Sequence, residues 1–191
     1  MIRPAVIISQ LGLLILIVGL AMLTCLPWSI IHKEEVIVSI SLAATVTIIS
    51  GFLLKYLFST GKSINVKEGF ALVGLGWIIA SVFGSLPFLF SGYLPNFADA
   101  FFETVSGFTT TGATIVKDVE AWPRGLMFWR CLTQWLGGMG IIVLFLALIA
   151  GMGARGTQLF KAEAPGGPII NKISPRIRET AQKLWLTYII I

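Results

Sequence analysis

The chain has 191 residues, of which 56% are hydrophobic and only 12% are charged, and its mean hydropathy is +0.90. Soluble domains carry about 25% charged residues, so this composition excludes a soluble protein and predicts an all-α integral membrane protein. The net charge of +5 must therefore be read against the bilayer, and it gives no reason to expect a nucleic-acid partner. The two cysteines, Cys25 and Cys131, offer neither a metal-ligand spacing nor a disulfide framework.

Two long apolar segments open the chain and are joined by a polar turn at residues 32–35. Residues 4–31 carry no charge, and neither do residues 36–54. Since a helix needs about 20 predominantly apolar residues to cross the hydrocarbon core, each segment predicts one membrane span. The first segment lacks the strongly basic start and the small-residue cleavage site of a signal peptide, so we interpret it as a retained helix.

Two further spans are predicted in the middle of the chain. Residues 69–98 are uncharged, and because the prolines near their end break helices, we place the span at about 69–89. Residues 125–154 carry a single charge, Arg130, and form the fourth predicted span. Residues 184–191 start another apolar segment, but eight residues cannot cross a bilayer, so we expect an N-terminal fragment of a longer protein.

Charged residues are distributed unevenly between the two sides that alternating spans would create. The side that holds the N-terminus carries ten Lys and Arg residues against three Asp and Glu residues. The opposite side carries three basic residues against six acidic ones. Basic residues in short loops favour the cytoplasm, so we predict a multi-pass membrane protein with a cytoplasmic N-terminus and an external segment at about 90–124.

The external segment contains a short predicted helix over residues 97–108. Its apolar residues recur at helical spacing, at Phe97, Phe101, Phe102, Val105 and Phe108. Twelve residues extend only about 18 Å, which suits a segment that enters the membrane partway and turns back. Asn96 can cap the start of this helix, and Gly107 can help to end it. Asp99 and Glu103 lie near its positive end, where carboxylates are favourable.

Residues 109–114, with the sequence TTTGAT, follow this helix directly. Threonine and glycine are poor helix formers, and non-helical backbone at membrane depth must be buried in protein or line water. In a water-lined pore, the carbonyl oxygens of Thr110, Thr111 and Gly112 could replace the hydration shell of a monovalent cation. The negative end of the preceding helix would face that ion. Spacing alone supports equally well an ordinary external turn behind an interfacial helix.

Several passages together resemble the TrkH-like potassium uptake proteins of the Trk/Ktr/HKT superfamily of cation transporters. They are GSLPF at 84–88, DAFFETVSGFTTTGAT at 99–114, QWLGGMGIIV at 134–143, KAE at 161–163 and PRIRETA at 175–181. The resemblance covers nearly the whole chain. It implies a fold of four membrane, pore-helix, membrane repeats like those of potassium channels, preceded by two extra helices.

On that plan the chain has five parts. Residues 1–54 would form the two N-terminal transmembrane helices, and residues 55–68 a cytoplasmic loop. Residues 69–154 would form the first repeat, followed by a cytoplasmic linker at 155–176 and the truncated start of a second repeat at 177–191. A chain of this extent holds one of four filter strands, so it should not conduct ions by itself.

The resemblance also implies a potassium site and a set of partners. Thr110, Thr111 and Gly112 would contribute the filter oxygens, and Thr109 and Ala113 would flank them. K⁺ would be the transported ion, and no cofactor is implied. Family members work as homodimers in the lipid bilayer and bind a cytosolic nucleotide-binding regulatory subunit, so both partners are expected for the intact protein. The implied function is potassium uptake; the alternative is a non-transporting membrane subunit or an inactive truncated product.

Arg130 and a group of glycines are the remaining candidates. A charge inside a span often marks an ion pathway, but we favour a pairing of Arg130 with a carboxylate such as Glu103. Gly137, Gly138 and Gly140 could form a gating hinge, but we favour close helix packing, the usual role of small residues in membranes. The sequence contains no Ser/His/Asp, Cys/His or phosphate-binding glycine pattern, so we expect no enzymatic activity.

Overall fold

The computed structural model describes residues 3–59, 66–151, 186–188 and 190. Helices and turns make up this part of the chain, and it contains no β-strand. The chain divides into two compact units, Met1–Gly137 and Gly138–Ile191. The predicted linker at 155–176 lies outside the described residues, as does most of the predicted start of a second repeat.

Three helical segments are long and apolar enough to cross a membrane, and they are Pro4–Ile31, Ile37–Leu57 and Lys67–Phe90. These segments confirm the first three predicted spans to within a few residues at each end. The fourth predicted span is also helical, since α7 (Arg124–Gly151) has 28 residues and a length of about 42 Å. The prediction of a helical membrane protein is therefore confirmed.

The first span consists of two helices, α1 (Pro4–Leu23) and α2 (Leu26–Ile31). They are separated at Thr24 and Cys25, whose N–H groups bond carbonyls three residues earlier. Pro27 accounts for the break because it has no N–H to donate, and its ring crowds the carbonyl one turn earlier. The sequence prediction treated this segment as continuous and missed the interruption.

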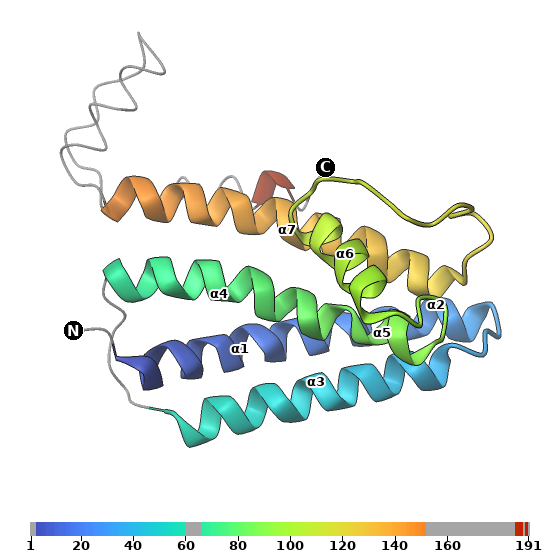
Figure 1. Cartoon of the computed structure of the whole chain (residues 1–191), viewed down its shortest axis with the longest axis horizontal. Helices are drawn as coiled ribbons and strands as arrows, with labels where there is room; N and C mark the ends of the chain where they lie inside the picture. Colours follow the sequence, from blue (N-terminus) through green and yellow to red (C-terminus); the bar gives the residue numbers. More distant parts are fainter. Residues whose placement is uncertain (1–2, 60–65, 152–185, 189, 191) are drawn as a thin grey trace, which may run out of the picture. The chain divides into compact units, whose positions relative to one another are not determined.

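α3 (Ile37–Leu57) packs along α1, which lies between α3 and α4 (Figure 1). The two backbones come very close where Gly12 of α1 meets Gly51 of α3. A Cβ on Gly51 would lie 2.7 Å from the backbone nitrogen of Leu16. No real side chain tolerates that distance, so glycine is what allows the two helices to touch.

The third span is built from α4 (Val66–Gly84) and α5 (Leu86–Phe90). The helix is interrupted between them because Pro87 has no N–H with which to continue the hydrogen-bond ladder. The Gly84 carbonyl instead accepts a hydrogen bond of 2.8 Å from the indole Nε1 of Trp129. The interruption thus creates a specific contact between the third span and α7.

α6 (Phe97–Phe108) has the bounds that the sequence predicts, and it packs on α4. Its buried residues are mostly small or polar, and they are Ala100, Glu103, Thr104, Ser106, Gly107 and Phe108. The rings of Phe97 and Phe102 are exposed. The spacing of the aromatic residues therefore predicted the helix correctly. The face of α6 that packs against the other helices consists mainly of small side chains, which let α6 approach its neighbours closely.

Candidate functional site

α6 begins with the cap that the sequence predicts. The Asn96 side chain accepts a hydrogen bond of 3.0 Å from the backbone N–H of Ala98, and Asp99 follows in the first turn. Both side chains place oxygen at the positive end of the helix dipole. The start of α6 is therefore defined, and its 12 residues determine where the next segment begins.

The end of α6 lies at Phe108, and residues 109–115 follow as exposed, non-helical chain. The backbone N–H of Thr111 bonds the Ser106 carbonyl at 3.0 Å, and that of Thr110 bonds another carbonyl of the last turn at 2.9 Å. These bonds satisfy helix-end carbonyls and turn the chain back toward α6. The predicted loss of helix at the TTTG sequence is confirmed.

Gly107 does not end α6, so that part of the sequence prediction is wrong. It lies inside the last turn, where a Cβ would lie 2.2 Å from the hydroxyl oxygen of Thr133. The residue that adopts left-handed backbone after the helix is Thr110, with φ of +56°. Glycine is needed at position 107 because α6 and α7 pack closely there, a use that local sequence does not distinguish from helix ending.

The backbone φ angle alternates in sign along the TTTG segment. φ is +56° at Thr110 and +74° at Gly112, whereas it is −82° at Thr109 and not positive at Thr111. In a uniformly extended chain, successive carbonyls point to opposite sides, so left-handed residues at alternate positions can direct them to one side. A β-branched residue in the left-handed region costs about 1–3 kcal/mol, and such strain is concentrated at functional sites.

Hydrogen bonds around the segment leave a particular set of carbonyl oxygens available. The Ala113 carbonyl accepts a bond of 2.5 Å from Ser106 Oγ. Within the part of the chain that the structure describes, no group donates to the carbonyls of Thr110, Thr111 and Gly112. The three predicted ligand residues therefore share available backbone oxygen, and the flanking Ala113 does not have it.

Thr109 is turned toward the helix that precedes it. Its hydroxyl donates to the Val105 carbonyl at 2.7 Å and lies 2.8 Å from the hydroxyl oxygen of Thr111. These contacts fix the first threonine of TTTG against the end of α6. No group among the described residues donates to the Thr109 carbonyl either, so carbonyl availability does not separate this flanking residue from the three predicted ligand residues.

Glu103 and Arg130 form an ion pair next to the segment. Arg130 Nε lies 2.5 Å from Glu103 Oε1, and the exposed fractions of the two side chains are 12% and 0%. The other carboxylate oxygen accepts hydrogen bonds from the Thr114 hydroxyl at 3.0 Å and from the Ile115 N–H at 3.2 Å. The favoured pairing of Arg130 is confirmed, and Glu103 also holds the chain just after TTTG.

One face of α7 carries the contacts to α6. Arg130, Thr133 and Gly137 recur on it at helical spacing. A Cβ on Gly137 would lie 2.0 Å from the Phe108 carbonyl oxygen, so the two backbones touch at that point. The packing interpretation is confirmed for Gly137.

The other two glycines of this group lie in the second unit. A Cβ on Gly138 would lie 2.3 Å from the hydroxyl oxygen of Tyr188, which again indicates close packing. The structure shows no contact that assigns a role to Gly140 among the described residues, and its packing role stays a prediction.

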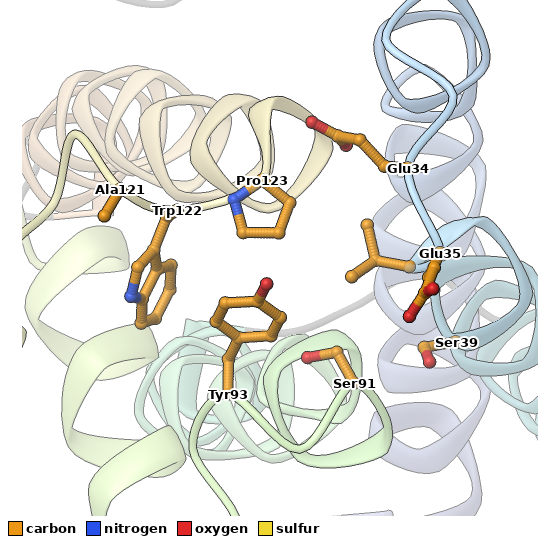
Figure 2. Close-up of a pocket in the computed structure, with 9 residues that line it drawn as sticks. Glu34, Glu35, Ser39, Ser91, Tyr93, Ala121, Trp122 and Pro123 are labelled. Carbon is orange, nitrogen blue, oxygen red and sulfur yellow. The ribbon is translucent and has the colours of Figure 1, made fainter.

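The turn between α2 and α3 is tied to the start of α7. The Glu34 carboxylate accepts hydrogen bonds from the backbone N–H groups of Arg124 and Gly125, the latter at 3.0 Å. It therefore caps the positive end of α7. Beside this cap lies a pocket of about 520 Å³, in which the acidic turn faces the rings of Tyr93 and Trp122 (Figure 2).

A second ion pair ties the start of α1 to the start of α4. Arg3 Nη2 lies 2.7 Å from Glu68 Oε2, and the exposed fractions of the side chains are 37% and 0%. The hydrogen bonds that the Arg3 side chain donates to the Glu68 carboxylate raise the pKa of Arg3, so its guanidinium stays charged. The Arg3–Glu68 pair places the starts of α1 and α4 at the same end of the helices, and the bond from the Arg124 N–H to Glu34 places the α2–α3 turn beside the start of α7. Both contacts are expected if the spans alternate in direction.

Sequence reasoning missed two polar residues of the site and one of the roles of a third. Ser106 and Glu34 were not singled out, and Glu103 was considered only as a dipole partner and as a partner of Arg130. Each of them bonds backbone that lies further along the chain or in another segment, which local patterns do not reveal. A signal existed for Glu103, because a carboxylate within a membrane-associated helix must find partners.

Comparison with known proteins identifies relatives of the chain. Residues 37–191 match the TrkH family, described as cation transport proteins. The chain is 48% identical over 127 residues to the Trk system potassium uptake protein TrkH of Escherichia coli strain K12, covering 65% of this chain and 26% of that protein. It is 36% identical over 185 residues to the protein of the same name from Halomonas elongata, covering 95% of this chain and 38% of that protein.

The fold agrees with a solved structure as well. The crystal structure of the potassium transporter TrkH from Vibrio parahaemolyticus matches with a TM-score of 0.80 and 32% sequence identity, over 98% of this chain and 37% of that one. The chain therefore spans about a quarter to two fifths of the length of these relatives. Because the family match covers most of the residues and the fold agrees, the chain belongs to the TrkH family of cation transport proteins.

Proposed function

We propose that this chain supplies one filter strand of a potassium uptake transporter, with the carbonyl oxygens of Thr110, Thr111 and Gly112 as ligands of K⁺. The observation that carries the proposal is the alternating sign of φ along a segment whose backbone carbonyls accept no hydrogen bond among the described residues. Carbonyl oxygens can replace the hydration shell of K⁺, and this step needs no proton or electron transfer. The partial negative charge at the end of α6 adds a favourable potential for a cation.

The relatives support the choice of ion and the division of the chain. Two are potassium uptake proteins and one is a potassium transporter. On this proposal, residues 69–154 are the first of four repeats, with α6 as the pore helix between two spans. Residues 1–54 are the two additional helices, and residues 177–191 begin the second repeat, with cytoplasmic segments at 55–68 and 155–176. The other filter strands would come from the rest of a complete transporter.

The proposed location is the plasma (inner) membrane, with the N-terminus in the cytoplasm and the segment containing α6 near the external side. The unequal distribution of Lys and Arg between the two sides supports this orientation. On the resemblance alone, we also propose that the complete transporter is a homodimer that binds a cytosolic nucleotide-binding regulatory subunit. The transport step itself requires no enzymatic chemistry and no cofactor.

The test uses a hybrid transporter in which this chain replaces the matched 185-residue segment of the Halomonas elongata relative. It is expressed in cells that lack other potassium uptake, and the uptake of K⁺ and Na⁺ is measured together with the amount of protein in the membrane. We expect Thr111→Val and Gly112→Ser to lower K⁺ uptake or K⁺/Na⁺ discrimination roughly tenfold, equivalent to about 1.4 kcal/mol. Gly112→Ser acts through the φ of +74°, which serine adopts only with strain.

Thr45→Val is the matched control, because Thr45 lies exposed on α3 and bonds only within its own helix. Unchanged discrimination in both filter variants would contradict the ligand assignment. A hybrid transporter that inserts into the membrane without taking up K⁺ would favour the alternative of a non-transporting membrane subunit.

A further inference from the structure

Glu103 connects three parts of the chain at the edge of the TTTG segment. We propose that it is a positioning residue on which the potassium selectivity of the filter depends, although it is not itself a ligand of the ion. The inference rests on the proposed function of TTTG. It assigns to the carboxylate the task of fixing the chain after the filter against α6 and α7.

The geometry uses both carboxylate oxygens of Glu103. Oε1 accepts the charged hydrogen bond from Arg130 at 2.5 Å, and Oε2 accepts from the Thr114 hydroxyl and the Ile115 N–H at 3.0 and 3.2 Å. The side chain is fully buried, with an exposed fraction of 0%. A buried carboxylate with three donors, one of them charged, is held in one orientation and is a rigid anchor.

A second anchor lies one turn further along α6. Ser106 Oγ donates to the Ala113 carbonyl at 2.5 Å, and the Ser106 carbonyl accepts from the Thr111 N–H at 3.0 Å. Glu103 and Ser106 together hold residues 111–115 to the same helix. The available carbonyls lie between the helix end and these anchors, so their spacing depends on both.

Selectivity for K⁺ over the smaller Na⁺ depends on how many carbonyl dipoles surround the ion and how far they can move inward. Releasing residues 114–115 from Glu103 would let the filter chain shift and would weaken that discrimination. Arg130 adds a charge effect, because without Glu103 its guanidinium is left unpaired close to these residues. Removing one partner of a buried ion pair costs far more than replacing both by neutral groups of similar shape.

The experiment compares variants of the hybrid transporter by K⁺/Na⁺ discrimination in uptake and by the amount of protein in the membrane. We expect Glu103→Gln to lower discrimination roughly tenfold at an unchanged amount of protein, as for the loss of a charged hydrogen bond. Glu103→Gln combined with Arg130→Gln should recover most of that loss. Thr114→Val keeps the ion pair and removes only the hydroxyl, so we expect a smaller loss of about threefold.

Asp99→Asn is the matched control, since Asp99 lies one turn earlier on α6 and forms no ion pair within the described residues. It should keep discrimination within about twofold of the parent. If Glu103→Gln accumulates poorly, the K⁺/Na⁺ discrimination of Thr114→Val tests the proposal instead, because this variant leaves no buried charge unpaired. If these variants only reduce the amount of protein in the membrane while K⁺/Na⁺ discrimination stays at the parental value, Glu103 has a merely structural role and the proposal is overturned.

The outcomes also separate this inference from the proposed function. If Thr111→Val loses discrimination while Glu103→Gln and Thr114→Val keep it, the positioning role is overturned and the filter assignment stands. If the parental hybrid transporter takes up no K⁺, or if both Thr111→Val and Gly112→Ser leave discrimination unchanged, the proposed function fails and the inference fails with it.

Discussion

The α1–α3 pair and the α6–α7 pair are both closely packed, but different interactions hold them. α1 and α3 meet where Gly12 faces Gly51, and most of the buried residues of the two helices are apolar. α6 and α7 also meet at glycines, but a buried ion pair and a hydroxyl anchor lie in the same region. Apolar packing thus holds the two spans together, whereas polar side chains also hold the chain where the backbone leaves α6.

The two regions also differ in how many of their backbone N–H and C=O groups lack a hydrogen-bond partner. In α1 and α3 nearly every backbone group is bonded within its own helix, so the pair has little with which to bind an ion. The TTTG segment keeps carbonyls available at Thr110, Thr111 and Gly112. The residues that follow these carbonyls are hydrogen-bonded to Glu103 and Ser106 of α6. The predictions below test this division of roles, and all of them use the hybrid transporter.

The largest effect is expected for Gly137→Val, because its Cβ would lie 2.0 Å from the Phe108 carbonyl oxygen. The side chain would force α7 away from α6 and lower the free energy of unfolding by about 3 kcal/mol or more. Thermal unfolding in detergent, followed by size-exclusion chromatography, measures the change. Gly74→Val is the control, since nothing lies within 4 Å of a Cβ there. Equal losses for both variants would contradict the close contact at Gly137.

Gly51→Ala should destabilise the α1–α3 pair by about 1–3 kcal/mol, because the added Cβ would lie 2.7 Å from the Leu16 nitrogen. The K⁺/Na⁺ discrimination of the protein that remains folded should not change, since the filter segment belongs to another region. Thermal unfolding and ion uptake are measured on the same preparation. A change in discrimination would show that the two regions are not independent.

Ser106→Ala removes the hydrogen bond to the Ala113 carbonyl and should cost about 1 kcal/mol of stability. It should also lower discrimination, because the freed carbonyl and its strand can move. Ser81→Ala is the matched control, since the buried Ser81 hydroxyl likewise bonds a backbone carbonyl, that of Trp77, at 2.8 Å. If both variants lose stability equally and both keep full discrimination, Ser106 is not a filter anchor.

Thr110→Gly should have the smallest effect on stability, within about 1 kcal/mol. Glycine relieves the strain of a φ of +56°, but it also increases the entropy of the unfolded chain. Thr109→Gly provides the comparison, because φ is −82° there and no strain is relieved. We expect Thr109→Gly to be the more destabilising of the two in thermal unfolding. The reverse order would argue against left-handed backbone at Thr110.

Much of the architecture could be predicted from local patterns. Uncharged segments of sufficient length located the spans, and Asn96 followed by residues at helical spacing located α6 to the residue. The pairing of Arg130 with Glu103 was also predictable, because two charges near the membrane interior must find each other. These features depend on one segment, or on one simple electrostatic requirement.

The errors arose where one residue type has two uses. Gly107 was predicted to end α6, yet it serves the packing of α6 on α7, and Thr110 takes the left-handed backbone instead. The effect of Pro27 within the first span was also missed, because the apolar run continues through it. In both cases the sequence signal was visible, but its meaning depended on the neighbouring helix or on backbone bonds.

The amino-acid sequence by itself determined that this protein is helical, lies in a membrane and turns from a short helix into a TTTG segment, because hydrophobic length, helix capping and helix propensity are local properties. Only the tertiary structure determined which carbonyls stay available and which residues hold them. Glu103 meets Thr114 and Arg130 only when α6, α7 and the chain between them have come together. Such contacts join residues that are distant in sequence, so no pattern within a single segment can encode them.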